Sequence, residues 1–499
     1  NTFGSITETA VSNSTVNIDH DGVMTAVGVT LNISGTGDNE YDGKIDASGA
    51  VAVTATGSGN VLFNDIDADG SSASVNVDAS GMSGTMDADA TNSTVVVTMT
   101  GGSGDDSLTG GSKSDTITGG AGADTLTGLA GNDTLTGGAG ADSIGGGAGN
   151  DSIIGGDGND TLISGAGFDT ITGGAGNDTF TFAANMSLSD NVDGGDGTDT
   201  ITATLSAGTA NQKIGTVTNV ENITLDFDQT TGSFNASGGS FTLITTTEGD
   251  TGTSDVSINN LSSSQTVRIT DGAADYDDVA LDYAADATAT IQLGDSATVV
   301  TDDVSVTDAQ TVNITTRGGT DTTTGLFTLD GTDTDFVTVA SGANDSGLTT
   351  EAFASDDIHT ISLTTTHTNS HLTFGTSFLN DAAELTTLTI AAGGDTDSDI
   401  NIAALGAGGA AALLETITVT AADEAQVLIG ALTATGATLT SITATASTSG
   451  STINFDGDIA AASATTITAS AVSGSTVDFD SDVDIATIGT INLTGAGTH

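Results

Sequence analysis

Aspartate recurs at every ninth residue between residues 101 and 181, and this spacing is the feature of the sequence best suited to chemistry. Nine consecutive nonapeptides there approximate G-G-x-G-x-D-x-U-x, where U is a large aliphatic residue or Phe. Short carboxylates in glycine-rich turns are the hard oxygen ligands that Ca²⁺ prefers. A tenth copy, residues 194–202, follows a twelve-residue interruption. The sixth place of the ten units holds Asp106, Asp115, Asp124, Asp133, Asp142, Asp151, Asp160, Asp169, Asp178 and Asp199.

The nonapeptide pattern predicts a six-residue turn followed by a three-residue strand. Glycine at places one, two and four permits backbone angles that are closed to other residues. Two units should complete one coil, so that alternate turns lie on opposite edges and equivalent turns stack at the strand spacing of ~4.8 Å. One edge would then carry Asp106, Asp124, Asp142, Asp160 and Asp178, and the other Asp115, Asp133, Asp151 and Asp169.

This stacking predicts Ca²⁺ ions between adjacent turns. Their ligands would be the aspartate carboxylates and main-chain carbonyls of the glycine region, around Gly119, Gly137, Gly155 and Gly173. Calcium takes six to eight oxygen ligands at ~2.3–2.6 Å, whereas Mg²⁺ demands a smaller octahedral site and keeps its waters. Without calcium the acids would face each other uncompensated. We therefore expect folding to be coupled to metal binding.

Three of the nonapeptides depart from the pattern. Lys113 replaces the third glycine of unit 110–118, Leu129 replaces the second glycine of unit 128–136, and Ser164 begins unit 164–172. We expect Lys113 to disturb one calcium site.

Residues 101–181 resemble the RTX (repeat-in-toxin) family, calcium-binding β-roll proteins exported by type I secretion systems. Residues 193–201 and 217–225 are similar to the junction of RTX-type surface-layer (S-layer) proteins of Gram-negative bacteria, and the Thr/Ala/Gly/Asp composition is similar too. The resemblance implies Ca²⁺ as cofactor, secretion in an unfolded state and self-assembly into a lattice at the cell surface. In that family a separate N-terminal domain binds lipopolysaccharide, and no part of this chain matches such a domain.

The charge balance restricts the partners of the protein. Asp and Glu number 66 against 5 Lys and Arg, which gives a net charge of −61. Binding nucleic acid needs a basic footprint, so we expect no nucleic-acid partner. Cys is absent, so there are no disulfides, and no apolar run reaches the ~20 residues of a transmembrane segment. The chain begins without Met or a visible signal peptide, and we interpret it as a processed or excised segment.

Periodic apolar residues outside the nonapeptides predict more stacked β-rungs. Residues 31–33, 51–53, 75–77 and 95–97 are apolar-x-apolar triplets 20 to 24 residues apart, with a second set at 43–46, 64–67 and 84–87. Such a period is typical of a solenoid. Strand centres 24 to 29 residues apart follow in the C-terminal part, at Ile361, Leu388, Ile417, Ile442, Ile467 and Ile491.

The predicted fold is therefore all-β, a parallel β-solenoid whose calcium-binding β-roll is flanked by further β-helix-like rungs. We expect N-terminal rungs over residues 1–100, the β-roll over 101–202, a β-rich linking or assembly region over 203–358, and C-terminal rungs over 359–499. Residues 203–358 show no clear period, and the best helix candidate, Ile402 to Leu414, is weak.

Other acidic and histidine positions give less specific signals. Asp65, Asp67 and Asp69 form a D-x-D-x-D-G run, which is either the opening of a calcium loop or an acidic solvated turn. The runs 395–399 and 478–484 are metal sites or simply carboxylates exposed by strand alternation. Three histidines are expected on a solvated strand face: His359, His367 and His371. The cations are expected to be too scattered to form an anion site: Lys44, Lys113, Lys213, Arg268 and Arg317.

No nucleophilic motif stands out, so we predict a structural protein and not an enzyme. The first hypothesis is a calcium-dependent S-layer or related surface-assembly subunit, extracellular and partnered with itself. An anchor to lipopolysaccharide or another surface glycan would lie outside this chain. The alternative is an RTX adhesin fragment that binds a glycan or host surface. A polysaccharide lyase or epimerase comes last, because such enzymes need a cluster of Lys, Arg, His or Tyr.

Overall fold

The computed structural model covers residues 1–499. It describes residues 6–10, 16–17, 24–26, 29–36, 39–47, 49–68, 74–182, 190–205, 214–227, 232–247, 254–270, 276–294, 303–317, 321–330, 334–342, 347–354, 358–375, 384–395, 398–405, 413–480, 483–485 and 488–498. All regular structure in these residues is β-strand, and every strand pairing within them is parallel. The protein is an all-β parallel solenoid, as the periodic sequence predicts. No helix in the described part could span a membrane.

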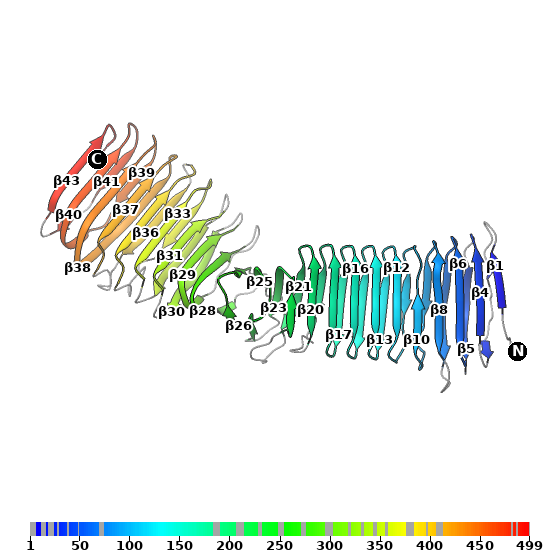
Figure 1. Ribbon diagram of the computed structural model, residues 1–499. Helices are drawn as coiled ribbons and strands as arrows, with labels where there is room; N and C mark the ends of the chain where they lie inside the picture. The colour runs from blue at the N-terminus through cyan, green and yellow to red at the C-terminus, as the bar shows by residue number, and fades with distance from the viewer. Residues whose placement is uncertain are drawn as a thin grey trace. The chain divides into compact units, whose positions relative to one another are not determined.

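The chain forms two compact units, Asn1–Thr204 with Gln212–Thr224 and Gly238–Phe241, and Leu205–Asn211 with Leu225–Ser237 and Thr242–His499. In each unit the strands lie side by side in a regular stack (Figure 1). The first unit begins with an eleven-stranded sheet. Its strands, in spatial order, are β1 (Ile6–Ala10), β4 (Val29–Gly35), β6 (Val51–Gly57), β8 (Val75–Met82), β10 (Val97–Thr100), β12 (Thr116–Ala121), β14 (Thr134–Ala139), β16 (Ser152–Asp157), β18 (Thr170–Ala175), β20 (Asn191–Asp196) and β22 (Thr216–Thr218).

The intervening strands pair with one another on a second side of the stack. They are β2 (Val16–Asn17), β3 (Met24–Ala26), β5 (Asn39–Ala47), β7 (Val61–Ala68), β9 (Met86–Asp89), β11 (Ser107–Thr109), β13 (Thr125–Ala130), β15 (Ser143–Ala148), β17 (Thr161–Ala166), β19 (Thr179–Phe182), β21 (Thr200–Leu205) and β23 (Asn222–Phe227). Alternate nonapeptides therefore belong to different sheets, and two of them complete one coil, as predicted.

The register of the nonapeptides follows the predicted 18-residue coil. Thr116 pairs with Thr134, and Thr125 pairs with Ser143. The predicted three-residue strands are too short, however, because pairing continues through the glycine region: Gly120 pairs with Gly138, and most strands of the roll have six residues. Ladder pairing thus includes part of what the sequence pattern assigns to the turn.

The core of the roll is a stack of one large side chain per nonapeptide. The residues at place eight have 0–1% of their surface exposed. Burial of a Leu or Ile side chain stabilises a fold by ~1.5–3 kcal/mol relative to its exposure, so many thin layers replace a compact core. The stack consists of Leu108, Ile117, Leu126, Leu135, Ile144, Ile153, Leu162, Ile171 and Phe180.

The N-terminal rungs continue directly into the roll, since β10 pairs with both β8 and β12. Some predicted alignments in these rungs are wrong by a few residues. Val97, and not Val95, is the partner of Val75. Met86 pairs with Val61, although Ile45 and Ile66 pair as expected. The two-residue shift at Val75 still buries the same face, so apolar alternation alone leaves the register open. The five-residue shift at Met86 is possible because two consecutive residues of β7, Asn64 and Asp65, are not buried.

The second unit has longer rungs. Its strands are β24 (Gly232–Asn235), β25 (Leu243–Thr247), β26 (Ser254–Leu261), β27 (Thr266–Ile269), β28 (Tyr276–Leu293), β29 (Asp303–Thr316), β30 (Asp321–Asp330), β31 (Phe336–Ser341), β32 (Gly347–Ala354), β33 (Thr360–Thr365), β34 (His371–Phe374), β35 (Thr387–Ala392), β36 (Asp399–Leu405), β37 (Thr416–Ala421), β38 (Gln426–Ala446), β39 (Thr452–Phe455), β40 (Ile459–Ala471), β41 (Thr476–Phe479), β42 (Val483–Ile485) and β43 (Ile488–Gly495).

The predicted strand centres of this unit pair with one another in order. Ile361 pairs with Leu388, and the row continues to Ile491. The region without a recognisable period also contains rungs, because Ile291 pairs with Ile314 in the same way. The suggested helix at Ile402 is wrong: Asp399–Leu405 is strand β36, and residues 406–412 lie outside the described part.

Leu129 has a backbone conformation that leucine rarely adopts. Its φ is +77°, whereas Gly120 and Gly138 take the same place in neighbouring units with φ of +123° and +125°. A left-handed conformation costs an ordinary L-residue ~1–2 kcal/mol. The Leu129 side chain is only half-buried, so it recovers little of this strain by packing.

Substitution Leu129→Gly should stabilise the folded protein. Glycine relieves the strain but adds conformational entropy to the unfolded chain, so we expect a net gain of ~0.5–1 kcal/mol in the free energy of unfolding. Urea denaturation at fixed calcium measures it. The matched control is Gly138→Ala, whose Cβ would collide with the carbonyl oxygen of Gly120 and should destabilise the fold. A lower free energy of unfolding for Leu129→Gly, or an unchanged one for Gly138→Ala, would contradict this account.

Candidate metal centre

The repeated aspartates form two hydrogen-bonded rows along the first unit. In each row a carboxylate oxygen, Oδ1, accepts the main-chain N–H of the aspartate one coil earlier. The N–H of Asp106 donates to Asp124 at 2.7 Å, and that of Asp142 donates to Asp160 at 2.8 Å. The second row does the same from Asp115 to Asp133 at 2.7 Å. The structure thus brings the predicted aspartates together in the two rows that their spacing predicts.

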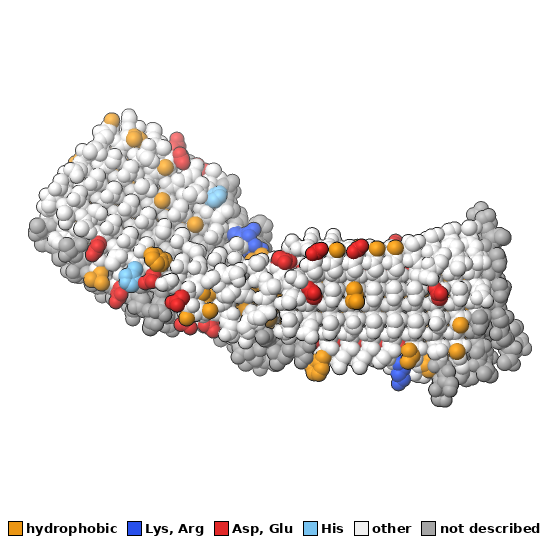
Figure 2. Space-filling model, viewed as in Figure 1, with side chains coloured by type: hydrophobic (Ala, Val, Ile, Leu, Met, Phe, Trp, Pro, Cys, Tyr) orange, Lys and Arg blue, Asp and Glu red, His pale blue; other side chains and the backbone are white. Residues whose placement is uncertain are grey.

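The second oxygen of most of these carboxylates is buried without a hydrogen-bond donor. The repeated aspartates have 0–3% of their surface exposed. In agreement with this burial, only scattered carboxylates colour the visible face of this unit (Figure 2). Within the described part of the chain, no hydrogen-bond partner reaches the Oδ2 atoms of Asp124, Asp133, Asp142, Asp151, Asp160, Asp169, Asp178 and Asp199.

Asp106 and Asp115, the first members of the two rows, are different. Their Oδ2 atoms accept the N–H of Gly102 and of Gly111, each at 2.6 Å. Their Oδ1 atoms accept N–H groups of Met86 and Val97, both at 2.7 Å. Both oxygens of the first carboxylate in each row are thus satisfied, one by an N–H of the N-terminal rungs and the other by an N–H of its own nonapeptide.

Burial disfavours the charged form of these carboxyls. Desolvation, together with the neighbouring carboxylates Asp106 and Asp142, raises the pKa of Asp124 to about 7, although the hydrogen bond from the Asp106 N–H acts to lower it. Desolvation likewise raises the pKa of Asp115, Asp151 and Asp160 to about 6. The same cause raises the pKa of the other row members, Asp106, Asp133, Asp142, Asp169, Asp178 and Asp199.

The glycine at place one of each unit leaves room beside the orphaned oxygen. A Cβ atom added at Gly137 would collide with Asp142 Oδ2 and with the carbonyl oxygen of Gly155. The same holds at Gly155, beside Asp160 Oδ2 and the carbonyl of Gly173. Two oxygens border each such space. A cation there can bind both, whereas no N–H group in the described part of the chain donates to the aspartate Oδ2 atom. The donor set therefore fits a hard cation such as Ca²⁺.

The carboxylates alone do not complete a metal site. Only one carboxylate of the rows belongs to each nonapeptide, and no group of three or more His, Asp or Glu side chains that could hold a metal occurs among the described residues. Main-chain carbonyls have to provide the remaining ligands, among them those at Gly119, Gly137, Gly155 and Gly173. Bound there, calcium would neutralise the buried charge and join successive coils.

The departures from the repeat pattern lie within the rows. Lys113 is exposed, and it is not among the residues with positive φ. Ser164 is buried at 1% exposure, and its Oγ has no hydrogen-bond partner among the described atoms. Ser164 replaces the glycine at place one of its unit, so this unit has a hydroxymethyl side chain where the other units have none.

The rows extend beyond the residues that the repeat pattern identifies. The N–H of Asp169 donates to Asp190 Oδ1 at 2.9 Å, and the N–H of Asp199 donates to Glu221 Oε2 at 2.8 Å. Asp190 lies in the interruption, but the segment 190–195 still has the order D-x-U-x-G-G, which is a usable signal. Glu221 follows no repeat, and only its position in the fold identifies it.

The described part of the D-x-D-x-D-G run is strand and not a loop. Asp65 and Asp67 lie on strand β7, on either side of the buried Ile66. Asp65 accepts a hydrogen bond from the Asn92 side chain at 3.2 Å. Asp69 lies outside the described residues. An extended strand points these two carboxylates to the surface, in agreement with the acidic solvated alternative.

The histidines contact carboxylates or carbonyls on neighbouring rungs. His371 Nδ1 lies 2.9 Å from Asp399 Oδ1, and His359 lies 3.0 Å from Asp335 and 3.4 Å from Glu384. His367 Nδ1 lies 3.0 Å from the carbonyl oxygen of Ser341. Of the acidic runs, 396–397 and 481–482 lie outside the described residues.

Two of the cations are close together, contrary to the expectation that all are scattered. Arg268 donates from Nε and Nη2 to Gln292 Oε1 at 3.0 and 2.9 Å. Arg317 donates from Nη1 to the same oxygen at 2.9 Å. The three residues belong to adjacent rungs, which the sequence separation of about 25 residues conceals.

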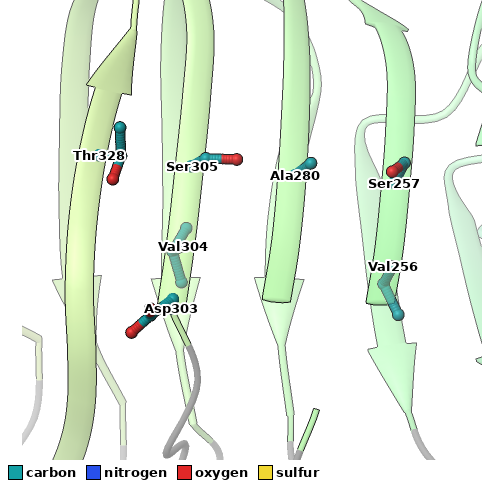
Figure 3. A pocket seen from close by; sticks show the side chains of 7 residues that line it. All are labelled: Val256, Ser257, Ala280, Asp303, Val304, Ser305 and Thr328. Carbon is teal, nitrogen blue, oxygen red and sulfur yellow. The ribbon is translucent and has the colours of Figure 1, made fainter. Parts of the chain in front are cut away.

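One cavity of about 380 Å³ opens on the second unit, between β26, β28, β29 and β30. Asp303 is its single carboxylate, accompanied by Ser257, Ser305 and Thr328 (Figure 3). Its remaining lining residues are Val256, Ala280 and Val304. The side chains of this lining provide one acid, three hydroxyls and no histidine, lysine or arginine.

Comparison with known protein families identifies the repeats. The family model of the RTX calcium-binding nonapeptide repeat matches residues 100–135, 121–153 and 154–184. Neither the curated proteins nor the solved structures contain a match to the chain. The chain therefore carries RTX calcium-binding repeats, and these indicate a calcium-binding, secreted protein.

The raised pKa values predict how the calcium-free protein responds to pH. A carboxyl with a raised pKa in the folded state binds more protons there than in the unfolded state. The free energy of unfolding should therefore fall as pH rises from about 4 to about 7, and it should be constant above that range. In chelator, β-structure measured by circular dichroism should be greater at pH 5 than at pH 8. With excess calcium this preference should disappear, because protons compete with the metal. More β-structure at pH 8 in chelator would contradict the prediction.

Substitution Asp142→Asn should have opposite effects with and without calcium. The amide keeps an oxygen to accept the Asp124 N–H, but it removes a buried charge. We expect a higher urea midpoint in chelator and a calcium midpoint of folding raised at least about threefold, because ligand charge sets calcium affinity. Calcium titration followed by circular dichroism measures both.

The matched control is Asp157→Asn, an exposed carboxylate of the same roll, which should change neither midpoint. A purely structural role for Asp142 would lower stability in both conditions.

Proposed function

We propose that the protein is a structural, non-enzymatic subunit of a surface assembly, secreted through a type I system and folded outside the cell by calcium. The observation that carries the proposal is the double row of buried carboxylates with orphaned oxygens. These groups oppose the fold until a cation neutralises them. A chain that binds the metal only when folded becomes more stable as the metal concentration rises.

The charge of the chain explains why secretion and folding are separable. At low calcium a net charge of −61 keeps the chain expanded, which suits export in an unfolded state. At the higher calcium concentration outside the cell the rows would be filled, and the coils could stack. The RTX repeats support this order of events.

An S-layer or related lattice is the form of assembly that we propose, with the protein itself as the principal partner. Stacked rungs with similar outer surfaces supply the repetitive faces that a lattice needs. Attachment to lipopolysaccharide or another surface glycan would be the task of a region outside this chain.

Calcium titration of the chelator-stripped protein, followed by circular dichroism and negative-stain electron microscopy, tests the proposal. We expect β-structure to form with calcium but not with magnesium, and ordered arrays or sheets to follow. Folded particles that stay single and are retained on a glycan array would favour an adhesin. Folding that ignores calcium would overturn the mechanism.

A further inference from the structure

One surface of the second unit is a regular array of hydroxyl groups. Strands β29, β31, β33, β35, β37, β38 and β40 each contribute three side chains that alternate with buried ones. The last strand, β43, contributes three more, but there the alternating Ile491 and Leu493 are exposed. We call this surface the threonine face. Its residues are Thr311, Asn313, Thr315; Phe336, Thr338, Ala340; Thr360, Ser362, Thr364; Thr387, Thr389, Ala391; Thr416, Thr418, Thr420; Ser441, Thr443, Thr445; Thr466, Thr468, Ser470; Thr490, Asn492 and Thr494.

The residues of the face are in register along all eight strands. Thr389 pairs with Thr418, which pairs with Thr443. Each of the three rows of paired residues continues along all eight strands without a register shift. Neighbouring strands are ~4.8 Å apart, and alternate residues of a strand are ~6.6 Å apart. The face therefore repeats in two directions at constant spacing.

The threonine face carries no charge. None of its twenty-four residues is Asp, Glu, Lys, Arg or His, although acids make up about one residue in eight of the chain. About three acids would be expected at random. Another side of the same unit does carry charged groups, including His371 and Asp399 on β34 and β36 and Asp478 on β41. Strand geometry alone thus does not exclude acids from the outer surface of this unit.

The absence of charge decides which partner the face fits. Two copies of a chain with net charge −61 repel each other wherever acids meet. The threonine face is a surface where they can approach without bringing carboxylates together. Each hydroxyl both donates and accepts hydrogen bonds, so the face is complementary to an identical face. Two sheets pack face to face at ~10 Å.

The size of the face is close to what a specific contact needs. Eight strands at ~4.8 Å give a length of ~34 Å, and three side chains across give a width of ~20 Å. The resulting area, roughly 700 Å² per copy, compares with the ~800 Å² per partner of a standard protein interface. Phe336, 47% exposed, adds an aromatic side chain of the kind that dominates binding energy at interfaces.

We propose that the threonine face docks against the same face of a second copy of this chain, in a two-fold symmetric contact. In such a contact both copies use the same surface. A single substitution therefore changes the interface at two positions. The inference rests on the proposed assembly function and names the surface through which it acts. Shielding of the remaining acids by calcium and salt should strengthen the contact.

The test is sedimentation of the calcium-loaded full chain carrying Thr418→Asp, at the centre of the face. Burying the new carboxylates should weaken self-association at least tenfold. The matched control is Thr373→Asp on β34, which faces outward on another side of the unit with similar exposure and adds the same charge. It should associate like the wild type. Thr418→Lys should also weaken association, which separates the geometry of the face from net charge.

Circular dichroism in calcium confirms that each variant is folded, and Thr443→Lys replaces any variant that is not. Association of Thr418→Asp at wild-type strength would overturn the face while leaving the assembly function in place. A folded wild-type protein that stays monomeric would overturn both. If that monomer is retained on a glycan array, the face would be assigned to a glycan. If it is retained on growing ice, whose surface is also a repeating hydrogen-bonding lattice, the face would be assigned to ice.

Discussion

The stacking distance of parallel strands is the constraint on which the first unit depends. Nonapeptides that repeat at 18 residues per coil place equivalent aspartates one strand spacing apart, ~4.8 Å. Their Oδ1 atoms satisfy main-chain N–H groups, and their Oδ2 atoms are buried without donors. The same carboxylates that hold successive coils together therefore oppose the fold through their charge. A cation resolves this conflict, and the glycine at place one leaves the room for it.

The two units place different polar groups in their interiors. In the first unit the buried polar side chains are mainly aspartates. In the second, the buried polar side chains among the described residues are Thr, Ser and Gln. Thr270 and Thr334, for example, donate to main-chain carbonyls at 2.7 Å. A neutral hydroxyl needs no counterion, so we attribute the calcium requirement to the first unit. The second unit is then free to present uncharged surfaces.

Particular residues show how far sequence reasoning extends. The aspartate rows, the place-eight stack and the order Ile361 to Ile491 follow from the period alone, because one repeat fixes one rung. Prediction fails where the period is broken. The wrong partner of Val75 arises because a shift of two residues preserves the buried face. That of Met86 arises because Asn64 and Asp65 interrupt the alternation of β7, so that a shift of five residues still buries Met86. Asp190 and Glu221 were missed because a longer connection separates them from the repeats.

The sequence by itself determined the solenoid class, the two rows of aspartate and the calcium chemistry, because a strict nine-residue period leaves one way to stack apolar and acidic side chains. Tertiary structure alone decided which carboxylate oxygens are orphaned, where Arg268 and Arg317 meet, and how threonines from eight rungs align into one face. These features depend on residues 18 to 29 positions apart. Such residues become neighbours only when the length of each rung and its register are fixed.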